Sequence, residues 1–151
     1  MSEPFLITHV SNPVRYRQAL GIVGGEHTKP EVIAAMSACG DQVLGKGVVT
    51  AKDTPNFIAN RIGTYGMASV FKHMAAEGLT IEAVDAIFGA AMGRPKSAVF
   101  RTADIVGLDT LNHVFTNLHE YLVDDDERDI FVLPDAVGTL LADGRTGQKA
   151  G

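Results

Sequence analysis

The pattern of apolar residues changes near residue 52, and this change limits the folds open to the 151-residue chain. The first part contains three short apolar runs typical of strands, "FLITHV" (5–10), "QALGIV" (18–23) and "GVVTA" (47–51), with one helical pattern between the second and the third. The rest contains helical spacing only, as in Leu111, Val114, Phe115, Leu118 and Leu122. We therefore predict a mainly α fold, with a short β-β-α-β segment (residues 1–51) followed by a helical bundle (residues 52–151).

The composition limits the classes of partner. Thirteen Lys and Arg against 18 Asp and Glu give a net charge of −5, which argues against nucleic-acid binding. No apolar run approaches the roughly 20 residues of a membrane span, and we see no signal peptide. The single cysteine, Cys39, excludes an intrachain disulfide and suits a reducing compartment, so we expect a cytoplasmic protein without membrane or nucleic-acid partners.

Several short motifs do not meet the requirements of cofactor or metal sites. "GKGVVT" (45–50) follows a helix and enters a strand, the reverse of a dinucleotide-binding turn. "DDDERD" (124–129) has no glycine where a calcium loop needs one, and we interpret it as a solvated linker. His113, Asn117 and Glu120 share a helix face, but no second cluster supports a metal site. We predict no metal site.

The segment "KDTPNFIANRIG" (52–63) combines a helix start with two unexpected polar residues. Thr54 and Pro55 predict a helix that begins at residue 54. Its apolar positions surround Asn60 and Arg61, and we interpret Arg61 as a packing or ion-pairing residue. Gly63 and Gly66 predict that neighbouring helices approach this helix closely.

Three blocks of the sequence together resemble the NAD-dependent 3-hydroxyacyl-CoA dehydrogenases of fatty-acid β-oxidation, especially the long multidomain bacterial members. The blocks are "THVSNPVRY" (8–16), "LGKGVVTAKDTPNFIANRIGTYG" (44–66) and "GRPKSAVFRTADIVGLDT" (93–110). In that family a Rossmann domain binds NAD and precedes a helical domain that binds acyl-CoA and forms a dimer. The resemblance implies that residues 1–51 are a remnant of the Rossmann domain and residues 52–151 most of the helical domain.

The resemblance also implies an active site. In the family, hydride passes from C3 of the hydroxyacyl-CoA to NAD while a histidine takes the hydroxyl proton. His9 matches that histidine, and Asn12 and Asn60 match the family's active-site asparagines. An imidazole suits a general base near neutral pH, and an amide can both donate and accept hydrogen bonds. We expect His9 and Asn60 to line one cavity where the two parts of the chain meet.

Two departures from the family leave two hypotheses open. First, Gly21 occupies the position of the glutamate that, in the family, orients the catalytic histidine. Second, the glycine-rich NAD fingerprint that the family has upstream of these blocks is absent. We therefore expect the isolated chain to bind no NAD and to be inactive. Under the first hypothesis, the chain is a piece of an acyl-CoA dehydrogenating enzyme. Under the second, it is a non-catalytic helical module for dimerisation or acyl-CoA binding. Both predict a homodimer.

Overall fold

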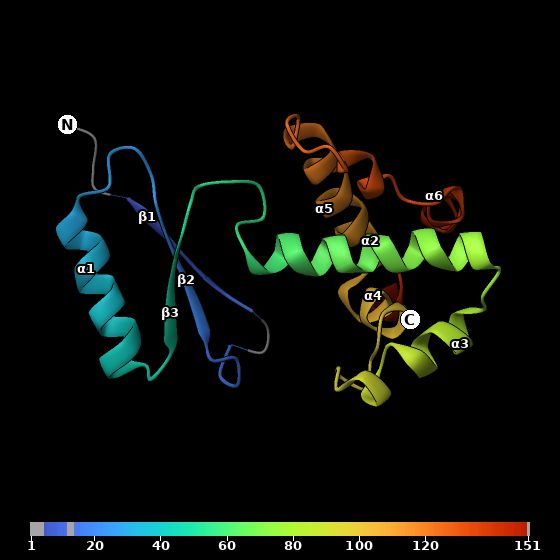
Figure 1. Cartoon of the computed structure of the whole chain (residues 1–151), viewed down its shortest axis with the longest axis horizontal. Coiled ribbons are helices and arrows are strands. Elements are labelled where there is room, and N and C mark those ends of the chain that lie inside the picture. The colour runs from blue at the N-terminus through green and yellow to red at the C-terminus, as the bar shows by residue number, and fades with distance from the viewer. Residues whose placement is uncertain (1–4, 12–13, 151) are drawn as a thin grey trace. The chain divides into compact units, whose positions relative to one another are not determined.

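The computed structural model describes residues 5–11 and 14–150, and the chain divides into two compact units. The first unit is Met1–Ile58 and the second is Ala59–Gly151. The elements follow the order β-β-α-β and then helices only, which confirms the predicted fold class (Figure 1). In the described part of the chain, no helix has the length and apolar character needed to cross a membrane.

The first unit is built on a small sheet, whose described strands are β1 (Leu6–Val10), β2 (Ala19–Gly24) and β3 (Gly47–Ala51). β2 lies in the middle, antiparallel to β1 and parallel to β3. A parallel pair needs a crossover connection, which helix α1 (Pro30–Ala38) and the π-helical turn Cys39–Val43 supply. Figure 1 shows α1 running alongside the sheet.

Gly40 explains how closely the crossover helix lies against the sheet. A Cβ atom at this position would come within 2.6 Å of Leu20 and 2.8 Å of Val48. Leu20 and Ile22 on this face of β2 are buried, at 4% and 0% exposed. Since side chains alternate along a strand, the opposite face of β2 carries Gly21 and Val23. That opposite face is where the candidate site begins.

The second unit is helical. Its longer helices are α2 (Ala59–Glu77), α3 (Ile81–Ile87), α4 (Phe100–Val106), α5 (Leu108–Tyr121) and α6 (Asp135–Ala142), joined by short 3₁₀ segments that include η3 (Arg128–Phe131). Thr80 caps α3, because its hydroxyl oxygen accepts the N–H of Ala83 at 3.2 Å. The helical spacing of residues 111–122 is confirmed by α5, which buries Leu111, Phe115 and Leu118.

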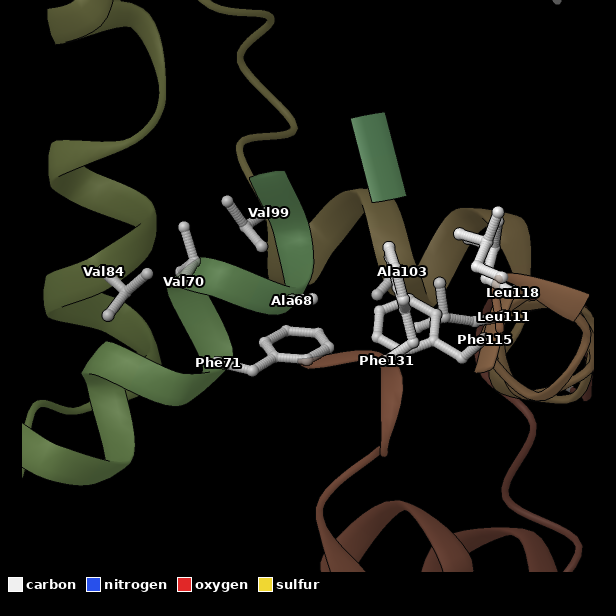
Figure 2. Close-up of a cluster of buried hydrophobic side chains, with 11 residues drawn as sticks. Ala68, Val70, Phe71, Val84, Val99, Ala103, Leu111, Phe115, Leu118 and Phe131 are labelled. Carbon is white, nitrogen blue, oxygen red and sulfur yellow. The ribbon is translucent and has the colours of Figure 1, made fainter. Parts of the chain in front are cut away.

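A row of aromatic rings crosses the core of the second unit. The ring centroids of Phe100 and Phe71 are 5.2 Å apart, and Phe71 stacks on Phe115 with 6.2 Å between their ring centroids. Phe131 meets Phe115 edge-on, with 6.1 Å between the ring centroids. Tyr65 continues the row, with its ring centroid 6.3 Å from that of Phe131. Figure 2 shows Phe71, Phe115 and Phe131 among the buried side chains of the cluster. The row links α2, α4, α5 and η3 into one core.

Asp85 on α3 caps the neighbouring helix α4. Its Oδ1 accepts the backbone N–H groups of Val99 at 3.1 Å and Phe100 at 2.8 Å, and its Oδ2 accepts that of Arg101 at 3.1 Å. The first N–H groups of a helix have no partner within the helix. One carboxylate, distant in sequence, therefore accepts hydrogen bonds from three backbone N–H groups at the start of α4. Its negative charge also interacts favourably with the positive end of the helix dipole.

The last described residues pack against the junction of α4 and α5. Leu108 donates its N–H to the Thr146 carbonyl at 2.9 Å. Lys149 pairs with Asp109 at 2.5 Å, and its hydrogen bond holds the pKa of the Asp109 carboxyl below the ordinary value. Gly147 has a φ of 105°, and a Cβ there would overlap the backbone of Asp104. Glycine thus permits this close approach of two backbone segments.

Two expectations about the central helix were wrong. α2 begins at Ala59 rather than at Thr54. Asn56 and Phe57 have φ values of 58° and 49°, so the backbone turns left-handed there and cannot join the helix. Gly63 and Gly66 are not tightly packed, because Cβ atoms at these two positions would meet nothing within 4 Å.

We expect the substitution Asn56→Gly to stabilise the first unit by about 1 kcal/mol. Asn56 combines a positive φ with a buried side-chain Nδ2 for which no hydrogen-bond partner is found. Glycine relieves both costs, whereas Asn56→Ala removes the amide but keeps the unfavourable φ, so we expect alanine to give no gain. Hydrogen exchange of the buried β2 amides of Ile22 and Val23 measures this difference. Equal stabilisation by alanine and glycine would show that the backbone conformation is not the cause.

Candidate active site

His9 lies on β1, directly opposite Gly21 on β2 in the antiparallel register. A Cβ atom built on Gly21 would lie 3.6 Å from the Cβ of His9, an ordinary contact distance. A side chain at position 21 would therefore fit, and it would lie beside the imidazole on the sheet face opposite α1. The glutamate expected from the family resemblance would start from this same position.

Phe57 brings the "KDTPNF" segment next to the same strand. Its ring centroid lies 5.8 Å from that of His9, with the two planes inclined at 54°. Both side chains are half-buried. Phe57 can take this position because the turn after Thr54 is closed by a hydrogen bond from the Phe57 N–H to the Thr54 carbonyl at 2.9 Å. Two of the sequence blocks that carry the family resemblance thus meet within the first unit.

The structure does not place the two predicted asparagines relative to His9. Asn60 is the second residue of α2, is exposed and belongs to the second unit. Asn12 lies outside the described residues. The structure therefore brings together His9, Gly21 and Phe57, while a cavity shared by His9 and Asn60 stays a prediction.

Arg61 forms an ion pair, in agreement with the sequence interpretation. Its Nη2 donates to Oδ2 of Asp125 at 2.7 Å, with the two side chains 37% and 27% exposed. This hydrogen bond holds the pKa of the Asp125 carboxyl below its ordinary value. Because the folded-state pKa is lowered, the pair stabilises the fold above the ordinary carboxyl pKa, and this stabilisation is lost as the pH falls through the lowered value.

The segment around Asp125 forms side-chain hydrogen bonds that the sequence did not predict. The hydroxyl of Tyr65 donates to Oε2 of Glu127, and this bond raises the pKa of Tyr65. The N–H of Glu127 bonds to Oδ1 of Asp125 at 3.1 Å. Sequence reasoning missed the Arg61–Asp125 and Tyr65–Glu127 contacts because the partners are separated by more than 60 residues.

A groove of about 330 Å³ in the second unit was also not predicted. It lies between α2 and α3, and its lining is mainly apolar, with Val70, Val84 and Phe88 among the residues. Arg94 stands at the groove, with its guanidinium 5.7 Å from the centre of the Phe88 ring. Such a lining suits an aliphatic chain with an anionic group near one end.

The described residues do not fit the pyrophosphate of NAD. The strand-to-helix connection from β2 to α1 carries Gly24 and Gly25, but without the spacing of the dinucleotide fingerprint. The N–H of Gly25 is already bonded to Oγ1 of Thr28 at 2.9 Å. Pro30 stands at the first helical position and has no N–H to offer. A phosphate cradle needs such donors free at the helix start.

Comparisons with known proteins identify the family of this chain. Residues 1–54 match the family model "3-hydroxyacyl-CoA dehydrogenase, NAD binding domain" and residues 57–151 match "3-hydroxyacyl-CoA dehydrogenase, C-terminal domain". The chain therefore belongs to the 3-hydroxyacyl-CoA dehydrogenase family, which confirms the resemblance seen in the sequence.

Individual relatives are longer than this chain. A probable 3-hydroxyacyl-CoA dehydrogenase of Bacillus subtilis is 50% identical over 97% of the chain, which spans 18% of that relative. One from Deinococcus radiodurans is 42% identical over 97% of the chain, which spans 42% of it. The crystal structure of (S)-3-hydroxybutyryl-CoA dehydrogenase PaaH1 from Ralstonia eutropha has a TM-score of 0.84 at 26% identity, covering 97% of this chain and 50% of that one. The chain thus spans half or less of these proteins.

Proposed function

We propose that this chain supplies the proton-accepting and substrate-binding part of an NAD-dependent enzyme that oxidises 3-hydroxyacyl-CoA to 3-oxoacyl-CoA. Residues 1–51 contribute His9 and Asn12, and residues 52–151 contribute Asn60. The observation that carries the proposal is the contact of His9 with Phe57, in a chain that matches the family along nearly its whole length. NAD is the hydride acceptor of the proposed reaction, and the described residues of this chain do not bind it.

In this proposal the imidazole of His9 accepts the proton of the substrate's 3-hydroxyl group, so that its oxygen can become a carbonyl. The amides of Asn12 and Asn60 hold the substrate by donating hydrogen bonds to the thioester carbonyl and to the oxygen of the 3-hydroxyl group. Orientation of this kind fixes the reacting oxygen near the base. Residues of this chain thus handle the proton and the orientation of the substrate.

Titration of the whole chain with acetoacetyl-CoA, a 3-oxoacyl-CoA, tests the proposal. We expect binding by calorimetry, with NMR shifts at the His9 ring and at the Asn60 side-chain amide. His9→Ala and Asn60→Ala should each weaken binding by about tenfold or more, as loss of a hydrogen bond to a ligand does. His113→Gln, on the exposed surface of α5, is the matched control. Unchanged affinity in both site variants contradicts the proposal.

We expect Gly21→Glu to move the midpoint of the His9 imidazole titration up by about one pH unit, because an adjacent carboxylate favours the charged ring. The register and the 3.6 Å between the two Cβ positions give the glutamate access to the ring. NMR titration of the His9 ring protons measures the shift. Gly21→Gln is the control, with the same length and no charge. Equal midpoints in the two variants would exclude a carboxylate–imidazole pair here.

A second candidate function is a non-catalytic module that binds acyl-CoA. Two points favour it: the family resemblance places Gly21 where a glutamate is expected, and the groove between α2 and α3 is mainly apolar with Arg94 beside it. In this case the acetoacetyl-CoA shifts would appear at Val70, Phe88 and Arg94, and Arg94→Gln would weaken binding while His9→Ala would not.

We also propose that the helical part forms a homodimer. Ile62 on α2 is 68% exposed, and Gly63 and Gly66 leave open space around the same helix. Apolar surface of this kind commonly marks an interface. Sedimentation equilibrium should give twice the chain mass of 16.0 kDa, and Ile62→Glu should lower the apparent mass towards that of one chain. A monomer at the highest concentration reached would contradict the proposal.

The compartment also stays a proposal. Cys39 is a free thiol, which favours the reducing cytoplasm.

A further inference from the structure

The loop between α5 and η3 is bonded to the first two turns of α2 by two side-chain pairs. Arg61 donates to Asp125 at 2.7 Å, and the Tyr65 hydroxyl donates to Glu127. Arg61 and Tyr65 are four residues apart, so they lie on one face of the helix. We call these four residues the α2 clamp.

The acceptor side of the clamp is fixed by the core. The N–H of Asp125 bonds to the carbonyl of Leu122 at 3.1 Å, and the N–H of Arg128 bonds to the carbonyl of Asp125 at 3.1 Å. Leu122 and Phe131, which flank the loop, are buried at 7% and 2% exposed. The two carboxylates are therefore held on a braced loop rather than on a free surface segment.

The donor side of the clamp lies at the N-terminal end of α2, which is largely exposed. Ala59, Asn60, Ile62 and Gly63 are all exposed, and Thr64 is the first buried residue of the helix. Gly63 also weakens this turn, since glycine is a poor helix former. The ion pair of Arg61 acts on the same turn that carries Asn60.

We propose that Asp125 and Glu127 are positioning residues: through Arg61 and Tyr65 they hold the first turn of α2 in place, and with it the amide of Asn60. This inference rests on the proposed function for the role of Asn60 towards substrate. Side-chain ion pairs at this exposure contribute little to global stability, so the clamp acts locally on the helix start. It extends the site to a loop more than 60 residues away in sequence.

Hydrogen exchange of the whole chain tests the local effect. In the double variant Asp125→Asn/Glu127→Gln we expect the amides of Gly63 and Thr64 to exchange at least fivefold faster, and the Asn60 side-chain amide signal to shift or broaden. Exchange at Phe71 should not change. Asp104→Asn, which removes the more exposed ion pair with Arg101, is the matched control and should leave all these signals unchanged.

Acetoacetyl-CoA binding to the same variants tests the link to substrate. We expect the double variant to bind about tenfold more weakly, as Asn60→Ala does, while Asp104→Asn binds normally. Arg61→Lys, which keeps a cation opposite Asp125, should recover most of the affinity that Arg61→Met loses. Faster exchange with unchanged affinity overturns the positioning role, and unchanged exchange overturns the clamp itself. If the unsubstituted chain binds no acetoacetyl-CoA, the proposed function fails, and the exchange and the Asn60 signal alone decide the inference.

Discussion

Replacement of Phe115 by alanine is expected to lower the free energy of unfolding of the helical unit by about 3–5 kcal/mol. The side chain is 1% exposed and lies in the middle of the aromatic row, between Phe71 and Phe131. Its removal deletes two ring contacts and leaves a cavity that the surrounding helices cannot close without moving. Urea denaturation followed by circular dichroism at 222 nm reports this unit, because it contains most of the helix.

Two further variants separate burial from general effects on α5. Phe115→Leu keeps most of the volume and should cost only about 1–1.5 kcal/mol. Tyr121→Ala removes an aromatic ring on the same helix that is 64% exposed, and should change stability by less than about 0.5 kcal/mol. A loss for Phe115→Ala no greater than that for Tyr121→Ala would contradict the role given to the aromatic row.

The second large effect is expected at Asp85, where substitution by alanine should destabilise the helical unit by about 2–4 kcal/mol. Three backbone N–H groups at the start of α4 donate to this carboxylate. Without it they lose a charged acceptor, and α4 loses its cap. The same urea titration measures the effect.

The division of the hydrogen bonds between the two oxygens gives a sharper expectation. Oδ1 accepts from Val99 and Phe100, whereas Oδ2 accepts only from Arg101. Asp85→Asn keeps one acceptor oxygen and should retain about half of the stability that alanine loses. Equal losses in the asparagine and alanine variants would show that backbone capping by Oδ1 is not the cause.

The elements with local signals were predictable from the sequence. The strand runs and the spacing of Leu111, Phe115 and Leu118 depend on neighbours a few residues apart, and the structure confirms them. The family resemblance also rests on contiguous blocks of sequence, which is why it was found without a structure.

The features missed by sequence reasoning depend on distant residues or on backbone conformation. Thr54 and Pro55 form a typical helix start, but the left-handed backbone of Asn56 and Phe57 delays the helix to Ala59. The partner of Arg61 lies 64 residues away, beyond the reach of any local pattern. The pairing of His9 with Gly21 required the strand register, which the turn between the strands does not reveal.

The docking of the last residues against the start of α5 has a consequence for protein synthesis. The contacts of the first unit lie within the first 58 residues, so this unit can fold as soon as they leave the ribosome. In the helical unit, the contacts of Leu108 and Asp109 form only after Thr146 and Lys149 have been translated. The nascent helical unit therefore exposes an incomplete α4–α5 junction until translation has passed residue 149, and a chain stopped earlier offers that surface to chaperones and proteases.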